Sequence, residues 1–258
     1  MQRRRTLIAT GFALLAARAV RAAAPPPTLS PGVLRIGTYF VNPPFEFIEN
    51  GRQVGYEVDL MDEIAERLGL APHYVSTHWE TILQEMQAHR YDCIVGGITI
   101  TKARERMLAW SVPYMTTTLS LIVNSVKTPG ITDLARMKNA TVGVQAATTD
   151  EDVAIIMQKK GEIGSVKVYP FDRIDDAMID LEAGRITAVM KVAPVAAYLA
   201  RQRPGLRIAA QVPDDPQPLG IGFAKSEQVL LAAVNDVLAS MRADGTLAKL
   251  AKRWGVPG

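Results

Sequence analysis

The sequence is poor in the residues that build disulfides, metal centres and membrane spans. Its single cysteine, Cys93, excludes an intramolecular disulfide and, within YDCIVGG, is predicted to be a small core residue. The three histidines, His73, His78 and His89, lack the spacing of metal ligands, and no nucleophile elbow of a hydrolase occurs. No segment after residue 24 approaches the roughly 20 apolar residues of a membrane-spanning helix. We therefore expect no metal, no cofactor and no catalytic residue.

The N-terminal segment MQRRRTLIATGFALLAARAVRA is typical of a secretory signal, with arginines, an apolar run and small residues in that order. Residues 1–24 are predicted to be a signal peptide, cleaved near Ala22 or Ala24. The adjacent Arg4 and Arg5 fit a twin-arginine signal as well as a general one, so the export route stays open. The mature protein is expected in the periplasm.

The positive charge of the sequence is concentrated in this segment. The whole chain has 29 basic and 26 acidic residues, a net charge of +3, but residues 1–22 contain five arginines and no acid. The mature chain therefore carries a charge of about −2. A protein that binds nucleic acid through a basic surface is disfavoured.

Strands alternate with helices along the remaining chain, as in GVLRIGTY followed by GYEVDLMDEIAERLGL. This alternation predicts parallel sheets covered by helices. Two extended runs interrupt it, which predicts two α/β lobes joined by a two-strand hinge. Lobe 1 is predicted to contain residues 31–116 and 221–258, lobe 2 residues 120–215, and the hinge crossings lie near 116–119 and 217–222.

The stretch GGITITKARERMLAWSVPY predicts an anion site in lobe 1. A buried strand ends near Gly97 and Thr99, and Thr101 is a suitable N-cap for the helix that follows. Arg104 then lies beside the Gly97 amide and the Thr99 hydroxyl, and together these groups suit a planar carboxylate. The simpler alternative is that Arg104 pairs with a surface acid.

A second anion site is predicted in lobe 2. The strand TVGV leads into QAATTDED, where Thr148 or Thr149 can cap a helix that begins at Asp150. The N-terminus of that helix offers free N–H groups and a positive dipole end. Because the two sites face the gap between the lobes, we expect Arg104 to hold a small carboxylate there.

The motifs PPFEF, GGITITKARERMLAWSVPY, VGVQAATTDE, LEAGRITAV and RADGTLAKLAKRWG occur in an order and spacing that resemble the extracellular solute-binding proteins of family 3. The resemblance covers nearly the whole mature chain. It implies a periplasmic-binding-protein-like fold of type II, and a monomer that captures an amino acid or related carboxylate for an inner-membrane ABC permease. The ligand-binding residues that it implies are Tyr39, Tyr56, Gly97, Thr99, Arg104, Thr148, Thr149 and Val192.

The sequence departs from the family pattern at two positions. Ala147 replaces a glycine, so a close backbone approach or a positive φ is expected to be lost. Val192 stands where family members usually have an acid that pairs with the ligand's α-ammonium. Either the ligand lacks this ammonium, or the register of the family pattern is shifted here, or another acid, such as Asp150 or Glu46, holds the ammonium. Lys191 is expected to point away from the cleft, because neighbouring strand residues face opposite sides.

Two other functions share the resemblance. Some similar proteins are periplasmic dehydratases acting on prephenate or arogenate, with a catalytic glutamate after a second-lobe strand. This chain has VAPVAAYLA there, so we expect no enzyme. A second alternative, a ligand-binding sensor that docks on a membrane kinase, is also compatible with the sequence. We interpret Trp79, Trp110 and Trp254 as core residues rather than ligand contacts.

Overall fold

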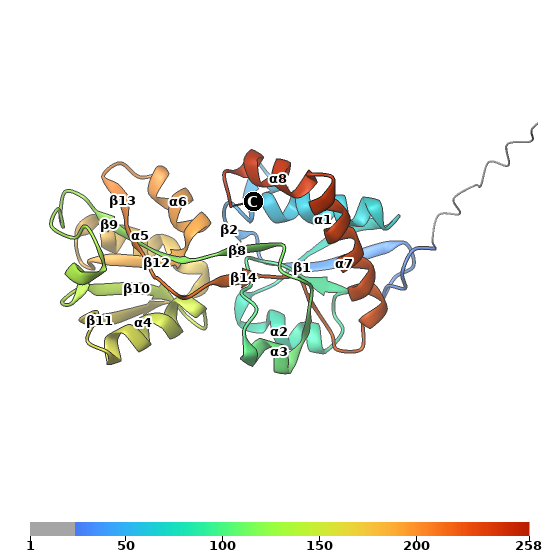
Figure 1. Cartoon of the computed structure of the whole chain (residues 1–258), viewed down its shortest axis with the longest axis horizontal. Helices are drawn as coiled ribbons and strands as arrows, with labels where there is room; N and C mark the ends of the chain where they lie inside the picture. The colour runs from blue at the N-terminus through green and yellow to red at the C-terminus, as the bar shows by residue number, and fades with distance from the viewer. Residues whose placement is uncertain (1–23, 258) are drawn as a thin grey trace, which may run out of the picture.

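The computed structural model describes residues 24–257. The predicted signal peptide lies outside this range except for its last residue. The chain forms two α/β lobes side by side (Figure 1). This confirms the predicted two-lobe fold.

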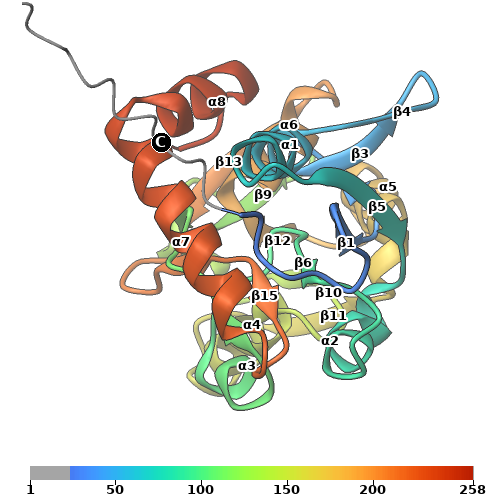
Figure 2. The same cartoon turned by 90° about the vertical axis from the view of Figure 1, so that its right-hand side faces the viewer.

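The first lobe contains residues from both ends of the mature chain. Its five-stranded sheet has the order β5 (Ala71–Ser76), β1 (Val33–Thr38), β6 (Cys93–Ile94), β15 (Gly222–Phe223) and β7 (Ala109–Trp110). Its helices are α1 (Tyr56–Arg67), α2 (Trp79–Gln87), α3 (Lys102–Met107), α7 (Gln228–Ala243) and α8 (Thr246–Trp254). Figure 2 shows α7 and α8 along one side of this lobe.

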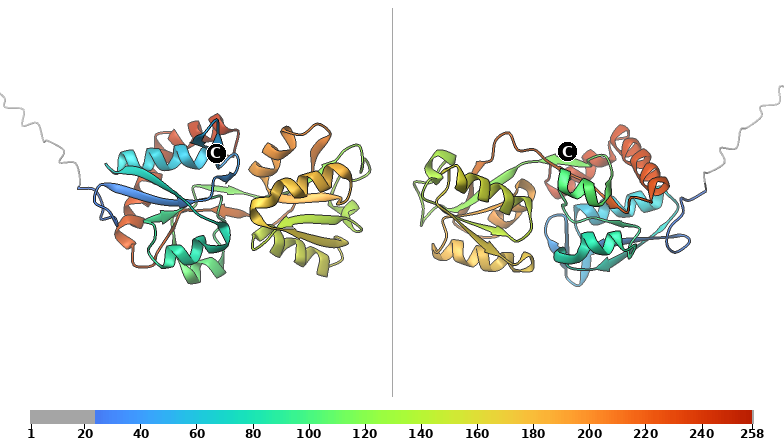
Figure 3. Two further views of the ribbon diagram at one scale, coloured as in Figure 1. Left: turned by 180° about the vertical axis from the view of Figure 1, so that it is seen from behind. Right: turned by 90° about the horizontal axis from the view of Figure 1, so that it is seen from below.

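The second lobe contains the middle of the chain. Its sheet has the order β11 (Ser165–Tyr169), β10 (Thr141–Gln145), β12 (Ala188–Val192), β9 (Leu119–Asn124) and β13 (Leu206–Gln211). The helical segments are α4 (Thr149–Lys159), α5 (Ile174–Ala183), α6 (Ala193–Arg201) and the short 3-10 turns η1 (Leu134–Met137) and η2 (Phe171–Arg173). Figure 3 shows the helices on both faces of this sheet.

Two paired strands connect the lobes. β8 (Met115–Thr117) leads out of the first lobe and β14 (Gln217–Leu219) leads back, and they pair antiparallel with Thr116 opposite Pro218. A smaller antiparallel sheet, β2 (Val41–Asn42), β3 (Glu46–Glu49) and β4 (Arg52–Val54), projects from the first lobe (Figure 2).

Both large sheets are mixed, whereas the sequence predicted parallel ones. β1 pairs in parallel with β5 and β6, and β10 with β11 and β12, but β15 and β9 run antiparallel to their neighbours. The reason is connectivity. β9 follows β8 and β15 follows β14, so each enters its sheet from the edge where the parallel strands end. A strand that enters from that edge has to run in the opposite direction.

The core follows the predicted hydrophobic pattern. In α1 the buried face includes Leu60, Met61 and Ile64, and Gly69, with φ of 68°, follows the end of the helix as expected for a terminator. Cys93 is fully buried in the first-lobe core, which confirms its predicted role. Within residues 24–257, none of the helices has both the length and the apolar character needed to span a membrane.

Candidate functional site

A narrow cavity with a volume of about 30 Å³ lies between the lobes, at the ends of the central strands. Loop and helix residues line it from the first lobe, and the start of α4, η2 and the end of β12 line it from the second. Of the residues implied by the resemblance, those at this cavity are Tyr39, Gly97, Thr99, Arg104, Thr148, Thr149 and Val192.

Tyr56 does not line this cavity. It begins α1, is 1% exposed, and its ring packs 6.4 Å from Phe45 and 6.0 Å from Tyr114, measured between ring centroids. Burial raises the pKa of its hydroxyl. The structure therefore places Tyr56 in the core of the first lobe, beneath the cavity wall rather than on it.

Arg104 lies as the sequence predicted, in the first turns of α3. The Thr101 hydroxyl caps this helix by accepting a 3.2 Å hydrogen bond from the Arg104 N–H. The guanidinium donates a 2.8 Å bond to the Thr99 carbonyl and lies 4.9 Å from the centre of the Trp79 ring. Burial lowers the pKa of Arg104.

None of the ion pairs within residues 24–257 involves Arg104. The simpler interpretation, in which Arg104 pairs with a surface acid, is therefore wrong for this part of the chain. A partly buried guanidinium without a carboxylate partner is suited to an anionic ligand.

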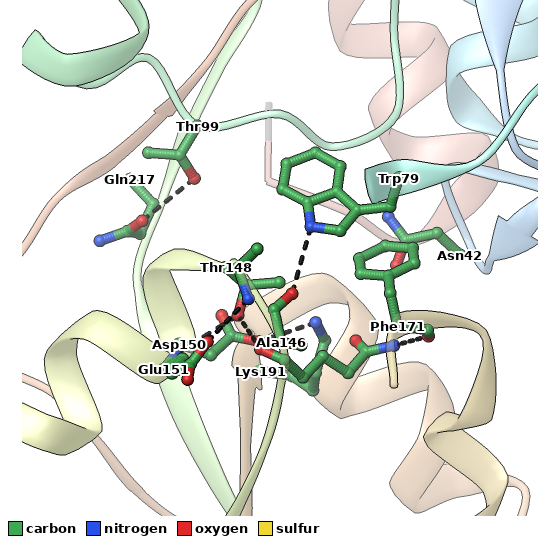
Figure 4. A network of polar contacts seen from close by, with 12 residues as sticks. Asn42, Trp79, Thr99, Ala146, Thr148, Asp150, Glu151, Phe171, Lys191 and Gln217 are labelled. Atoms are coloured by element: carbon green, nitrogen blue, oxygen red, sulfur yellow. Dashed lines mark hydrogen bonds and ion pairs between the residues drawn. The ribbon is translucent and has the colours of Figure 1, made fainter. Parts of the chain in front are cut away.

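The strand end beside Arg104 differs in detail from the prediction. The Gly97 N–H is not free, because it donates a 2.8 Å hydrogen bond to the Glu57 carboxylate. Gly97 has φ of 62°, and a Cβ at this position would meet the Asn42 amide at 2.9 Å, so glycine is required. The Thr99 hydroxyl donates a 3.1 Å bond to Gln217, leaving its oxygen to accept from a ligand (Figure 4).

The second-lobe site is the N-terminus of α4. The sequence left the cap open between two threonines; in the structure Thr148 is the cap, its hydroxyl accepting a 3.3 Å bond from the Glu151 N–H, and Thr149 is the first helical residue. The Glu151 carboxylate in turn accepts a 2.7 Å bond from the Ala147 N–H. The first N–H groups of a helix have no acceptor within it, and the Thr148 hydroxyl satisfies only that of Glu151, so the N–H groups of Thr149 and Asp150 are available to a ligand.

Ala147 keeps the conformation that the missing glycine would have adopted. Its φ is 59°, so the expected loss of a positive φ is wrong. The left-handed conformation costs an L-residue about 1–2 kcal/mol. The turn into α4 is therefore held in shape by its surroundings at a local cost.

Three aromatic rings from both lobes form one wall of the cavity. Trp79 stacks on Phe171 at 5.2 Å between centroids, and Tyr39 meets both rings edge-on, at 6.0 Å and 4.9 Å. The Tyr39 hydroxyl donates to the Gly96 carbonyl. The Trp79 Nε1 group donates a 3.2 Å bond to the Ala146 carbonyl of the second lobe (Figure 4).

Sequence reasoning missed two of these rings. Trp79 was interpreted as a core residue; it is buried, but it also faces the cavity and contacts both Arg104 and the second lobe. Phe171 was not singled out, although it closely follows the end of β11. Its position after a strand end was the available signal, because strand ends form the binding edge of α/β sheets.

A buried ion pair lies on the second-lobe side. Lys191 Nζ is 2.7 Å from Asp150 Oδ2, and the two side chains are 5% and 1% exposed. Figure 4 shows the pair below the aromatic wall. Lys191 lines the cavity together with Val192, so the expectation that it points away is wrong. β12 ends at this edge, where a long side chain reaches the neighbouring start of α4.

Two further carboxyls are buried behind the strand end of the first lobe. Glu57 accepts hydrogen bonds from the Gly97 N–H and the Tyr114 hydroxyl, while neither oxygen of Glu46 has a hydrogen-bond partner within the described residues. Burial, and then the charge of Glu57, raises the pKa of Glu46 well above its usual range. Burial also raises the pKa of Glu57. Burial therefore disfavours the charged form of both carboxyls, and more strongly that of Glu46.

A larger hollow lies on the outer face of the second lobe, between η1, α4 and residues 212–215. None of the ion pairs of residues 24–257 lies in its lining, whereas the interlobe cavity brings together the Arg104 guanidinium, the Lys191–Asp150 pair, the helix N-terminus and the aromatic wall. We therefore assign ligand binding to the interlobe cavity. Among residues 24–257, no group of three or more His, Cys, Asp or Glu side chains is arranged to hold a metal ion.

Two α/β lobes with a polar cavity between them define the class of two-lobe ligand-binding proteins. Within this class, the chain belongs to the bacterial extracellular solute-binding proteins, family 3, whose sequence model matches residues 34–257. This confirms the family that the sequence motifs indicated.

Individual relatives agree with this assignment. The chain is 27% identical to the L-cystine-binding protein TcyJ of Escherichia coli K12, over 86% of this chain and 82% of that protein. Among solved structures, an ancestral arginine-binding protein bound to arginine is 31% identical with a TM-score of 0.78, covering 86% of this chain and 98% of that one. An ancestral amino acid-binding protein, AncCDT-1, described as a precursor of cyclohexadienyl dehydratase, is 30% identical with a TM-score of 0.76, covering 86% and 95%.

Proposed function

We propose that this protein captures an amino acid or a related small carboxylate between its lobes, in the periplasm, and delivers it to an ABC importer of the inner membrane. The relatives named above support the class of ligand and the transport role, because their names describe binding of cystine, arginine and other amino acids. The proposal includes a monomer without enzymatic activity. The segment after β12, VAPVAAYLA, contains no acid that could serve as a general acid or base.

The observation that carries the proposal is the position of Arg104. It is a partly buried guanidinium at the cavity with no ion-pair partner among residues 24–257, and it faces the N-terminus of α4. A carboxylate placed between them would accept hydrogen bonds from the guanidinium of one lobe and the amides of the other. The ligand-binding residues of the proposal are Tyr39, Thr99, Arg104, Thr148 and Thr149, with Gly97 shaping the strand end.

Such a ligand would also hold the lobes together. Neither lobe surrounds the cavity alone, so we infer that the segments near 116–119 and 217–222 act as a hinge between lobe 1 (31–116 and 221–258) and lobe 2 (120–215). Small-angle X-ray scattering of the mature protein should give a smaller radius of gyration at saturating ligand than in its absence. Identical curves would contradict closure.

The first experiment is a thermal-shift screen of amino acids, oxo acids and small dicarboxylates on the mature protein, after ligand has been removed by unfolding and refolding. A ligand at 100 times its Kd stabilises the folded protein by about 2.7 kcal/mol, which raises the Tm of a chain of this size by roughly 5–10 °C. Uptake of the ligand that is found should then fail in cells that lack this protein. If no small carboxylate shifts the Tm, the proposed function is wrong.

A further inference from the structure

The lining of the interlobe cavity carries more positive than negative charge. It includes two cationic side chains, Arg104 and Lys191, and one carboxylate, Asp150. The net charge of the lining is therefore +1. A zwitterionic ligand would leave this charge unbalanced, whereas a ligand with a net charge of −1 would neutralise it.

The single lining carboxylate already has a partner. Asp150 Oδ2 accepts a 2.7 Å charge-assisted bond from Lys191 Nζ, and both side chains are almost completely buried. A ligand ammonium that took Asp150 from Lys191 would leave the lysine buried without a counter-ion. If both ammonium groups shared Asp150, two like charges would lie side by side. Either arrangement disfavours a cationic group on the ligand at this end of the cavity.

The neighbouring wall offers an ammonium group no substitute. Val192, which is 6% exposed, contributes only its aliphatic side chain to the lining. Glu46 and Glu57 do not line the cavity. Glu57 accepts hydrogen bonds from the Gly97 N–H and the Tyr114 hydroxyl, and Glu46 is 1% exposed and outside the lining. A buried ammonium with no acceptor is strongly unfavourable.

We propose that the ligand is a small carboxylate without an ammonium group, such as a 2-oxo acid. This inference rests on the proposed function and narrows its ligand class. The carboxylate binds between Arg104 and the N-terminus of α4. The Lys191–Asp150 pair is the specificity-determining feature, because Asp150 is the only carboxylate that residues 24–257 contribute to the lining, and Lys191 occupies it. The rest of the ligand contacts Val192 and the aromatic wall of Trp79 and Phe171, which favours an apolar tail.

Matched ligand pairs test this proposal directly. Pyruvate and alanine, 4-methyl-2-oxopentanoate and leucine, and phenylpyruvate and phenylalanine differ at the carbon next to the carboxylate and share their tails. Each is titrated by calorimetry into the mature, ligand-free protein. In every pair that binds, the oxo acid is expected to bind at least 10-fold more tightly than the amino acid.

The outcomes separate this inference from the proposed function. An amino acid that binds as tightly as its oxo acid, or more tightly, overturns the inference and leaves the proposed function intact. If neither these pairs nor any carboxylate of the thermal-shift screen binds, both fail. Binding of oxo acids with the expected preference supports both.

Two isosteric variants test the structural cause. Val192→Asp places a carboxylate at the aliphatic wall, and Val192→Asn places a neutral side chain of the same size there. Val192→Asp is expected to move the ratio of oxo-acid to amino-acid affinity at least 10-fold toward the amino acid, and Val192→Asn to move it much less. Equal effects of the two variants would contradict the electrostatic explanation.

Lys191→Met provides a second measurement if Val192→Asp does not fold. It removes the partner of Asp150 while keeping the length of the side chain, so the carboxylate becomes available to a ligand ammonium. The ratio of oxo-acid to amino-acid affinity is expected to move toward the amino acid. The double variant Lys191→Met with Asp150→Asn is the matched control, in which this shift should disappear. An unchanged ratio in Lys191→Met overturns the role of the pair.

Discussion

Trp79 donates a hydrogen bond from its indole Nε1 to the carbonyl of Ala146, across the gap between the two lobes, with a length of 3.2 Å. The same ring covers the guanidinium of Arg104 and stacks on Phe171 of the second lobe. One side chain thus contacts the proposed ligand anchor and the opposite wall. The fluorescence of Trp79 should therefore respond to both ligand binding and lobe closure.

Trp79→Phe is expected to weaken ligand binding roughly 2- to 10-fold. The variant keeps the ring but loses one interlobe hydrogen bond, worth about 0.5–1.5 kcal/mol. The ligand-dependent change of tryptophan fluorescence should also largely disappear. Trp110→Phe is the control, because the Trp110 Nε1 group is buried without a hydrogen-bond partner in the described chain. Wild-type affinity together with an unchanged fluorescence response in Trp79→Phe would contradict the assigned position.

Arg104→Lys is expected to weaken binding at least 10-fold, and Arg104→Ala about 100-fold or more. Lysine keeps the charge but cannot form two parallel hydrogen bonds to a carboxylate. Alanine leaves the ligand carboxylate without a counter-charge, which costs about 3 kcal/mol of binding free energy. Calorimetry with the ligand found in the screen measures both. Arg106→Ala, on the same short helix but outside the cavity lining, serves as the control. Binding by Arg104→Ala within a few-fold of wild type would refute the anchor.

Glu46→Gln is expected to raise the stability of the protein at neutral pH. The pKa of Glu46 is raised in the folded protein above its ordinary value of 4.5, so the folded state retains a proton that the unfolded state releases. Its contribution to stability is therefore fully present below about pH 4.5 and is lost as the pH rises through the folded-state pKa. Glutamine has nearly the shape of the protonated acid and carries no charge at any pH, so the variant avoids this loss.

Thermal unfolding between pH 4 and pH 8 measures this effect. The Tm difference between Glu46→Gln and wild type should be small at pH 4 and should grow toward pH 8, where the variant is more stable. Glu49→Gln is the matched control, because Glu49 lies on the same strand and is exposed. A difference that does not change with pH would show that Glu46 is not held protonated.

Ala147→Gly is expected to stabilise the protein by about 0.5–1 kcal/mol. Glycine removes a left-handed strain of about 1–2 kcal/mol and adds about 0.5–1 kcal/mol of conformational freedom to the unfolded chain. Ala146→Gly, which makes the same substitution one residue earlier at a position without a positive φ, should instead destabilise. Urea unfolding of both variants measures the difference. Equal destabilisation by the two would show that Ala147 is not strained.

Local chemistry predicted the position of Arg104 on its helix. Thr101 is followed by a run of good helix formers, and a cap of this kind fixes where Arg104 lies on the helix. The two extended runs that interrupt the alternation of strands and helices likewise predicted two lobes. The direction of β9 and β15 was missed, because it depends on the edge from which the chain re-enters each sheet, which no local pattern encodes.

The contacts that the sequence did not predict are those between distant segments. Lys191 contacts Asp150 only because β12 ends, and α4 begins, at the same edge of the sheet. The lysine side chain is long enough to reach the cavity even though alternate strand residues normally face opposite sides. Trp79 and Phe171 come from different lobes and meet only across the gap. Tyr56 had the family position of a ligand contact, yet its ring packs into the core beside Phe45.

The hydrogen bond between Thr99 and Gln217 joins a cavity residue to one of the two strands that connect the lobes. Thr99 also bridges to Leu219 on the same strand. The axis of a rotation of the second lobe about these strands would thus pass beside Thr99. The far rims of the lobes would lie at a large distance from this axis. A small rotation of the second lobe would leave the half-site on the first lobe almost stationary. The same rotation would move the half-site at the N-terminus of α4 by a much larger distance. The ligand would thus bind first to a stationary half-site on the first lobe, and the second lobe would then move to contact the bound ligand.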